Sequence, residues 1–345
     1  MKIIIDAMGG DNAPLAFLEG GFRAAKELGI EVVLVGRVEE LLKLMKEKGI
    51  ETLPKGVELM DAEQVVDMHD DPATVVRAKK ESSMVKGLKL LADGGGDAFL
   101  SAGSTGGLLS AATLVVKRVR GIRRAAFGPT IPTKTGNMIL IDSGANAECS
   151  PEFLLQFGCM GSFYAKKALD IQRPRVGLLN NGTEDIKGDE LHKEAYQLLK
   201  AAGEKGTIDF VGNVEARDAM AGACDVLVCD GFSGNVMLKS IEGTALFMGS
   251  LLKKTLYRSF KTKLAALLLK KDLKQLMGTL DYKKVGGTML LGISKPVIKA
   301  HGSSDAEAVV GAVRQAIAAV NAGICEAIKE NINEMTLPKE MDPNA

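Results

Sequence analysis

The chain has 345 residues, of which 46% are hydrophobic, 25% charged and only 4% aromatic. This composition is typical of a soluble globular protein, and the length allows one large domain or two interlocked ones. Forty-four lysines and arginines nearly balance 43 aspartates and glutamates, which leaves a net charge of +1. No overall positive field would attract nucleic acid, so we expect no nucleic-acid partner.

The five cysteines are scattered, with no CxxC pair and no histidine at ligand spacing. This pattern predicts a reduced intracellular protein without a zinc site. The N-terminus lacks the basic stretch and cleavage site of a signal peptide, because Ile3 to Ile5 leads directly into Asp6. We therefore expect a cytoplasmic protein.

Short apolar runs alternate with amphipathic stretches along most of the chain, which predicts an α/β protein with a largely parallel sheet. Nearly all the apolar runs end in Gly, Asp, Asn or Ser. In open α/β sheets ligands bind beyond the carboxyl ends of the strands, so these polar ends should converge on one cleft. The expected strands are 2–6, 31–36, 56–60, 97–103, 137–144, 175–181, 208–213 and 224–231.

Helices are predicted between the strands. Asp71 and Pro72 have the cap and first-position chemistry of a helix over 71–80, and Ser150 and Pro151 have it for 150–169. Residues 98–116 carry no charge and reach membrane-spanning length, but their first half is rich in Gly, Ser and Thr. We expect a strand, a glycine-rich turn and a buried helix there. The polar residues 336–345 contain two prolines and predict a disordered tail.

The segment 241–284 breaks the α/β alternation. Its residues from 253 onward include ten lysines and arginines and two aspartates, a local net charge of +8. Three interpretations remain open: a solvated helical hairpin, a surface that docks an acidic protein, and a helix pair that lies on an anionic membrane. Leucine or phenylalanine recurs at every fourth position, which predicts one shared helical face: Leu252, Leu256, Phe260, Leu264 and Leu268.

Two glycine-containing loops follow expected strands. In the stretch 100–118, glycines could let several N–H groups curl around a phosphate or carboxylate; the alternative is a tight-packing turn. It matches neither the Walker A nor the GxGxxG pattern. Its candidate residues are Ser101, Gly103, Ser104, Thr105, Gly106 and Gly107. In the opening stretch IIIDAMGGDNAP, we expect Gly9 and Gly10 to allow a close backbone approach, and Asp6 and Asp11 to pin loops rather than bind an anion that they would repel.

Four further strand ends supply small donors and cations for the same cleft. A serine hydrolase is not indicated, because GFSGN (231–235) has the wrong spacing for GxSxG. The flanks of the strand at 224–231 place Cys224 and Cys229 in the core rather than at a reactive site. No tight carboxylate cluster demands a divalent metal. The remaining candidates are Asn146, Thr183, Lys187, Asp230, Asn235, His301, Ser303 and Ser304.

Taken in order, these loops resemble the bacterial phosphate acyltransferases of the PlsX type, which move a fatty acyl chain from acyl carrier protein to inorganic phosphate. The resemblance runs from about residue 2 to about residue 325. Departures are few: the family commonly has Asn where Ser104 stands and proline where Ala125 stands. The matching motifs are IDAMGGDNAP, SAGSTGG, IDSGAN with PEFLLQFGCMGSFYAK, GLLNNGTEDIKGDEL, FVGNVEARD, VCDGFSGNVMLKSIEGTA and VIKAHGSSDAEA.

The resemblance implies a three-layer, doubly wound fold similar to isocitrate dehydrogenase and phosphotransacetylase. Residues 1–335 would form one catalytic unit of two intertwined lobes, from which the basic segment 241–284 protrudes. It also implies a homodimer without a cofactor, bound peripherally to the inner face of the cell membrane. There the acyl phosphate would pass to a membrane acyltransferase that acylates glycerol-3-phosphate in phospholipid synthesis.

Within that family the candidate residues take hypothetical roles. The backbone and hydroxyls of 101–107 would hold phosphate, and Lys187 would offset its charge. His301, with Ser303 and Ser304, would donate to the oxyanion or to the departing thiolate. Asn146, Thr183, Asp230 and Asn235 would contribute to catalysis, orient the phosphopantetheine arm or fix loops. A surface formed by Lys253, Lys254, Leu256, Arg258 and Phe260 would meet the carrier protein, the membrane or both.

Three alternatives stay open. The nearest is a short-chain acyltransferase of the phosphotransacetylase kind that uses coenzyme A. The second is a metal- and NAD-dependent decarboxylating dehydrogenase on the same fold, for which clustered metal aspartates are not evident. The third is a membrane-docked binding protein without turnover.

Overall fold

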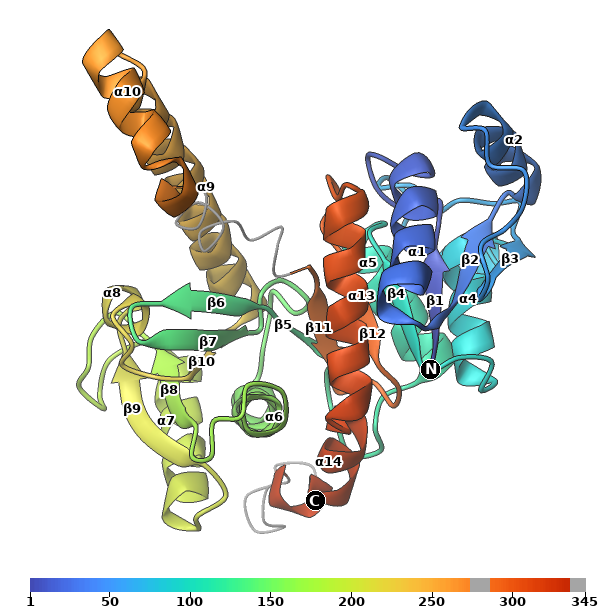
Figure 1. The fold of residues 1–345 in the computed structure, drawn as a ribbon. Coiled ribbons are helices and arrows are strands. Elements are labelled where there is room, and N and C mark those ends of the chain that lie inside the picture. Colours follow the sequence, from blue (N-terminus) through green and yellow to red (C-terminus); the bar gives the residue numbers. More distant parts are fainter. Residues whose placement is uncertain (274–285, 336–345) are drawn as a thin grey trace.

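The computed structural model describes residues 1–273 and 286–335, which form two β-sheets flanked by helices (Figure 1). The seven-stranded sheet has the order β3-β2-β1-β4-β12-β11-β5, and the five-stranded sheet has the order β6-β7-β10-β8-β9. The strands are β1 (Lys2–Asp6), β2 (Glu31–Gly36), β3 (Val57–Asp61), β4 (Ala98–Ser101), β5 (Ala126–Gly128), β6 (Thr130–Thr133), β7 (Gly136–Ile141), β8 (Arg175–Leu179), β9 (Asp209–Val214), β10 (Val226–Val228), β11 (Thr288–Leu291) and β12 (Val297–Lys299).

Most neighbouring strands are parallel, as predicted. In the seven-stranded sheet only the pairs β12–β11 and β11–β5 are antiparallel, and in the five-stranded sheet only β6–β7. All eight predicted strands are present. The four additional strands, β5, β6, β11 and β12, have three or four residues each, too few to produce a visible alternation of apolar and polar positions.

The chain leaves the seven-stranded sheet after β5, builds the whole five-stranded sheet, and returns with β11 and β12. The seven-stranded sheet is therefore not one continuous piece of sequence. This path confirms the predicted fold of two intertwined lobes.

Helices cover both faces of each sheet. Ile3 and Ile5 of β1 pack in one core cluster with Phe17 and Val309, on helices α1 and α13, whereas Ile4 packs in another cluster with α4. The five-stranded sheet is covered by α6 and α7 on one face and by α8 and the start of α9 on the other. Each sheet is thus the middle of three layers.

The helices are α1 (Leu15–Leu28), α2 (Val38–Glu47), α3 (Val75–Ala78), α4 (Ser83–Ala92), α5 (Thr105–Ala111), α6 (Pro151–Ala168), α7 (Glu190–Glu204), α8 (Ala216–Met220), α9 (Gly231–Leu256), α10 (Phe260–Leu268), α13 (Ala306–Asn321) and α14 (Ile324–Glu330), with the π-helix η1 (Ala112–Val116) and the 3₁₀-helix η2 (Ile332–Met335). The prediction for 71–80 is wrong. The Asp71 side chain accepts from the Ala73 amide and its carbonyl from Thr74, so these residues form a turn and the helix begins only at Val75.

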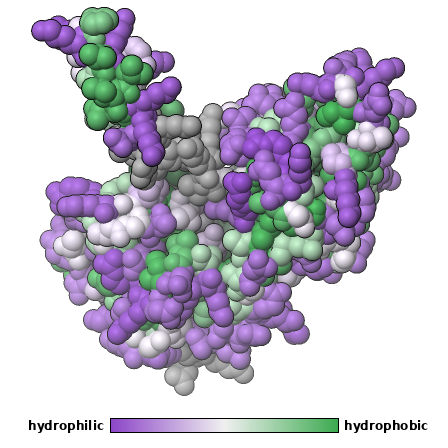
Figure 2. All heavy atoms as spheres, viewed as in Figure 1, coloured by the Kyte–Doolittle hydropathy of each residue, from purple (hydrophilic) through white to green (hydrophobic). Residues whose placement is uncertain are grey.

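Helices α9 and α10 form a hairpin that projects from the body of the protein (Figure 1), and apolar side chains lie exposed on it (Figure 2). The prediction of one shared helical face over 252–268 is wrong. Helix α9 ends at Leu256, and Ser259 starts α10 with a capping box to Thr262, so the direction of the chain changes between them. Of the basic segment 241–284, residues 274–284 lie outside the described residues, as does the predicted tail 336–345.

One stretch, α13 with α14 over Ala306–Glu330, has the length and hydropathy of a membrane span, but half of it is buried. Helix α13 packs against α1 and strand β4, so we interpret it as a core helix. The uncharged segment 98–116 forms β4, α5 and η1, as predicted.

Candidate active site

A cavity of about 580 Å³ lies between the two sheets and is lined by residues from both. Its polar part is made by the loops that follow β1, β4 and β12, which carry Asp11, Thr105, His301 and Ser304. Its apolar part is made by β5, β6, the end of α8 and the middle of α9. The carboxyl ends of parallel strands are where ligands bind in open α/β sheets.

The opening loop is held by Asp6, which is buried at the end of β1. Its Oδ2 accepts a hydrogen bond of 2.7 Å from the Ser101 hydroxyl, and its Oδ1 accepts from the Met8 amide at 3.1 Å. Burial raises the pKa of Asp6, while the hydroxyls of Ser83 and Ser101 and the amides of Met8 and Gly9 act in the opposite direction. A Cβ on Gly9 would lie 2.7 Å from the Gly103 nitrogen, so only glycine allows the two loops to touch.

Several polar groups of the glycine-rich loop are used within the loop. The Ser101 hydroxyl accepts from the Gly103 amide, and the Ser104 hydroxyl accepts from the Gly107 amide as the N-cap of α5. Cβ atoms on Gly106 and Gly107 would crowd Pro72 and Val66. Thr105 is exposed and lines the cavity. These contacts favour the tight-packing alternative for the loop, with Thr105 as its side chain on the cavity.

Ser303 and Ser304 stabilise the loop 301–304 through hydrogen bonds to His301. The Ser303 amide donates to Nδ1 of His301 at 3.2 Å, and the Ser303 hydroxyl lies 3.0 Å from the same atom. Because an amide can only donate, Nδ1 accepts, and a neutral His301 ring carries its proton on Nε2. The Ser304 hydroxyl donates to the His301 carbonyl at 2.6 Å. The loop is joined to the opening loop by the Asp11 amide, which donates to the Gly302 carbonyl.

Among the residues that the structure describes, Lys239 and Lys299 are the lysines that line the cavity. Lys299 ends β12, and its Nζ donates to the carbonyls of Ala300 at 2.6 Å and Ala102 at 3.4 Å. Burial, and then repulsion by Lys239, lower the pKa of Lys299 to about 8. Lys239 is half-exposed on α9 and pairs with Glu242 at 2.7 Å. Lys299 is not among the site residues predicted from the sequence, although its place directly after a buried apolar pair and before AHGSS was the available signal.

Two predicted site residues lie away from this cavity. Lys187 and Thr183 are exposed in the loop that follows β8 and do not line it. Strand β8 is separated from β6 by β7 and β10, so its end opens on another part of the sheet edge.

Two other predicted site residues, Asn146 and Asp230, use their side chains in structural hydrogen bonds. The Asn146 amide donates to the Ala125 carbonyl and to Asp142, and the Asp230 carboxylate caps α9 by accepting from the amides of Phe232 and Ser233. These contacts favour loop-fixing roles for both. Asn235 is exposed and does line the cavity.

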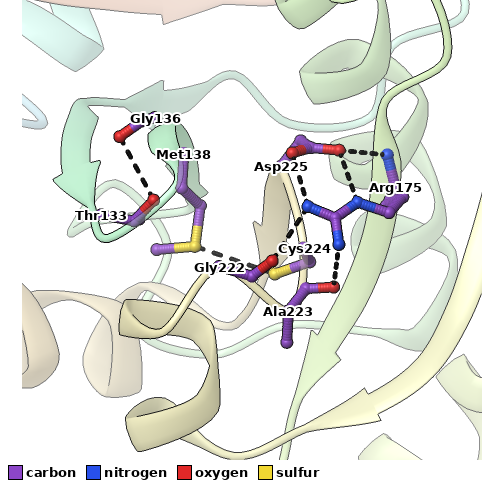
Figure 3. Close-up of polar contacts among 8 residues, drawn as sticks. All are labelled: Thr133, Gly136, Met138, Arg175, Gly222, Ala223, Cys224 and Asp225. Atoms are coloured by element: carbon purple, nitrogen blue, oxygen red, sulfur yellow. Dashed lines mark hydrogen bonds and ion pairs between the residues drawn. The ribbon is translucent and has the colours of Figure 1, made fainter.

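Within residues 1–273 and 286–335, no cluster of three or more His, Cys, Asp or Glu side chains has the arrangement of a metal site. The Asp225 carboxylate binds the guanidinium of Arg175 at the amino ends of β8 and β10 (Figure 3). Beside it, Cys224 is buried with its sulfur 3.7 Å from that of Met138. Burial raises the pKa of the Cys224 thiol to about 12, as expected for an unreactive core cysteine.

Comparisons with known proteins agree with this geometry. A family model described as Fatty acid synthesis protein matches residues 1–327. A phosphate acyltransferase from Thermoanaerobacter pseudethanolicus is 46% identical over 97% of this chain and 98% of its own. One from Oceanobacillus iheyensis is 49% identical over 92% of each. Among solved structures, a phosphotransacetylase from Streptococcus pyogenes has the same fold, with a TM-score of 0.59 and 19% identity over 93% of this chain and 94% of that one. The chain therefore belongs to the PlsX-type phosphate acyltransferases and is an acyltransferase.

Proposed function

We propose that this protein transfers a long-chain fatty acyl group from acyl carrier protein to inorganic phosphate, and that the acyl phosphate then serves the acylation of glycerol-3-phosphate in phospholipid synthesis. The observation that carries the proposal is the two-sided cavity, cationic and hydrogen-bonding at the strand ends and apolar where β5, β6 and Leu238 and Ile241 of α9 line it. Family membership favours acyl transfer over the dehydrogenase and binding-protein alternatives.

The polar end suits attack by phosphate on a thioester. A phosphate oxygen adds to the thioester carbonyl, the C–S bond breaks, and the phosphopantetheine sulfur leaves as a thiolate. Phosphate is already anionic at neutral pH and a thiol has a pKa of about 8.5, so no strong general base is required. What the protein must supply is alignment and donors for the developing oxyanion, and the Nε2–H of His301 is our candidate donor.

The apolar end suits a long acyl chain. Phe127, Ile131, Leu238 and Ile241 line it from β5, β6 and α9. Each buried CH₂ group contributes about 0.8 kcal/mol, so this wall favours a long chain over the acetyl group of a short-chain phosphotransacetylase.

The α9–α10 hairpin suits an acidic carrier protein and an anionic membrane surface. Lys253, Lys254 and Arg258 are exposed and would steer an acidic partner. Phe260 is 83% exposed and Leu268 79%, which is unusual for side chains of their size. We propose peripheral attachment to the inner face of the cell membrane, close to the acyltransferase that consumes the product.

A homodimer is part of the proposal. Leu246, Phe247 and Met248 are each more than half exposed on the part of α9 that leaves the body. A helix that is apolar on several faces is normally buried, and a second copy of the chain would bury this part of α9. Sedimentation velocity would report the dimer, and a monomer at micromolar concentration would contradict this part.

The central experiment supplies phosphate with long-chain acyl carrier protein or with long-chain acyl-CoA, and traps acyl phosphate with hydroxylamine. We expect product from acyl carrier protein, and none when phosphate is replaced by chloride. Product from acyl-CoA alone would contradict the proposal.

The hairpin is tested by two pairs of substitutions. Lys253→Glu with Lys254→Glu should weaken carrier-protein affinity, whereas Leu256→Gln with Phe260→Ser should reduce sedimentation with anionic liposomes. Lys43→Glu with Lys46→Glu on α2 changes the charge equally at exposed positions and serves as the control. If the hairpin variants retain both properties, the hairpin has neither role.

A further inference from the structure

Lys299 occupies the middle of the polar edge of the seven-stranded sheet. It pairs in register with Ser101 of β4, and Asp6 ends the next strand, β1. Three neighbouring parallel strands therefore end in a carboxylate, a hydroxyl and an ammonium. The carboxylate and the hydroxyl bond each other at 2.7 Å, while the ammonium lines the cavity.

The Lys299 ammonium lacks a counterion among the residues that the structure describes. Its Nζ contacts two carbonyl oxygens, and no carboxylate of residues 1–273 or 286–335 lies within 4.0 Å of it. A lysine ammonium has three N–H donors, so two carbonyls leave one for a ligand in the cavity. Lys239, the other cation there, is already paired with Glu242.

An unpaired cation in a largely buried position is costly and is stabilised by an anion that enters the site. The lowered pKa of Lys299 has this origin: burial is the main cause, repulsion by Lys239 the second, and Asp11 and Asp6 act in the opposite direction. An anion placed near both lysines would relieve the desolvation and the repulsion together.

In the glycine-rich loop 101–107, which the sequence predicts to bind phosphate, several polar groups already have partners. The Ser101 and Ser104 hydroxyls and the Gly103 and Gly107 amides are used within the loop or by Asp6. Lys187 lies outside the cavity lining.

We propose that the ammonium of Lys299 binds the phosphate that attacks the acyl donor, with Thr105, Thr288 and Ser304 among the hydroxyl side chains on the cavity. The assignment rests on the proposed function and deepens it, because it names the residue that holds the nucleophile. Lys299 keeps its proton throughout. It positions phosphate and offsets its charge while the P–O oxygen attacks.

The first test compares Lys299→Met, which keeps the length of the side chain, with Lys295→Met. Lys295 is also partly buried and donates to one carbonyl, that of Leu91 at 2.7 Å, but it lies before β12, at the opposite end of the strand. Losing a hydrogen bond to a charged group should raise the KM for phosphate about 10- to 100-fold in Lys299→Met. The KM for the acyl donor should change by about twofold or less in both variants. An unchanged KM for phosphate in Lys299→Met would overturn the assignment.

The second test needs no variant and no turnover. Differential acetylation of the native protein, followed by peptide mass mapping, measures the reactivity of Lys299 with and without inorganic phosphate, and Lys295 is the internal reference. Phosphate should protect Lys299 at least about tenfold and leave Lys295 unchanged. Equal labelling of Lys299 with and without phosphate would overturn the assignment even if Lys299→Met does not fold.

The two proposals fail separately. If the native protein makes no acyl phosphate from acyl carrier protein, the proposed function fails, and protection of Lys299 by phosphate still supports the phosphate site. If acyl phosphate forms but phosphate neither protects Lys299 nor depends on it, the proposed function stands and this inference fails.

Discussion

Two buried aspartates lie at the ends of interior strands, one in each sheet. The sheet edge at Asp142 is closed by hydrogen bonds, whereas the edge at Asp6 carries the ammonium of Lys299 into the cavity. Asp142 follows β7 and accepts from the amides of Phe127, Gly144, Ala145 and Asn146 and from the Asn146 side chain. Asp6 ends β1 and accepts from one hydroxyl and from local amides. Burial raises the pKa of both carboxyl groups, and hydrogen bonds offset part of that effect.

The neighbouring strand accounts for the difference. Strand β10 lies beside β7 and is followed by Asp230, whose carboxylate caps α9. The polar side chains at this sheet edge are therefore occupied by structural hydrogen bonds. Beside β1 and β4, strand β12 ends in Lys299, whose ammonium reaches the cavity. Both sheet edges reach the cavity, but among the described residues the edge at Lys299 adds an ammonium without a counterion.

The largest expected effect comes from Asp142→Ala. Five donors would lose their acceptor, three of them in buried hydrogen bonds, and each unsatisfied buried donor costs about 1–3 kcal/mol. We expect the free energy of unfolding to fall by about 4 kcal/mol or more, measured by urea denaturation followed by circular dichroism. A loss below about 1 kcal/mol would mean that water replaces the carboxylate and that this edge is not closed.

The sequence predicts the fold through features that are local. Apolar runs such as residues 31–36 are long enough to be recognised as strands, and their polar ends predict where ligands bind. The order of strands is not local, and it decides which ends meet. For that reason Thr105, Asn235, His301 and Ser304 reach the cavity, whereas Lys187 and Thr183 do not.

The same limit explains the residues that sequence reasoning missed. Lys299 belongs to a strand of three residues, and its importance arises from its pairing with β4, which lies almost 200 positions earlier in the chain. Asp142 and Asp6 have the same local pattern, an apolar run followed by aspartate and a glycine-containing loop. Only the hydrogen-bond partners separate them.

Asp6→Asn tests the link between Asp6 and Lys299 at the edge of the seven-stranded sheet. An amide keeps the shape but removes the charge, so Ser101 loses a charge-assisted bond and the unfolding free energy should fall by about 2 kcal/mol. Asp6 also acts to raise the pKa of Lys299, so its loss should lower that pKa further and weaken phosphate binding at neutral pH. The urea midpoint measures the loss of stability, and the KM for phosphate measures the weaker binding. Unchanged phosphate binding would separate Asp6 from Lys299.

The pH dependence of phosphate binding follows from the lysine. Lys299, with a pKa lowered to about 8, is charged below that pH and neutral above it. The charged groups that act on it are Asp6 on β1, Asp11 in the loop after β1, and Lys239 on α9. We expect the affinity for phosphate, measured by calorimetry, to fall about tenfold per pH unit well above pH 8, where phosphate is already a dianion and the lysine is the group that changes its charge.

Lys299→Arg is the control for that profile, because a guanidinium stays charged at every pH in question. Its phosphate affinity should show no fall between about pH 8 and pH 10. The same fall in the arginine variant would assign the titration to another group.

The smallest expected effect comes from Ser104→Ala, and it separates a cap from a phosphate ligand. The Ser104 hydroxyl accepts from the Gly107 amide at 3.3 Å, and that of Ser82 accepts from Val85 at the same distance, at the start of α4. Ser82 lies outside the cavity lining, so Ser82→Ala is a matched control. Each change should lower the unfolding free energy by about 1 kcal/mol and leave the KM for phosphate within about twofold. A selective rise in that KM for Ser104→Ala would return the glycine-rich loop to the phosphate site and weaken the case that Lys299 alone makes this edge differ from the one at Asp142.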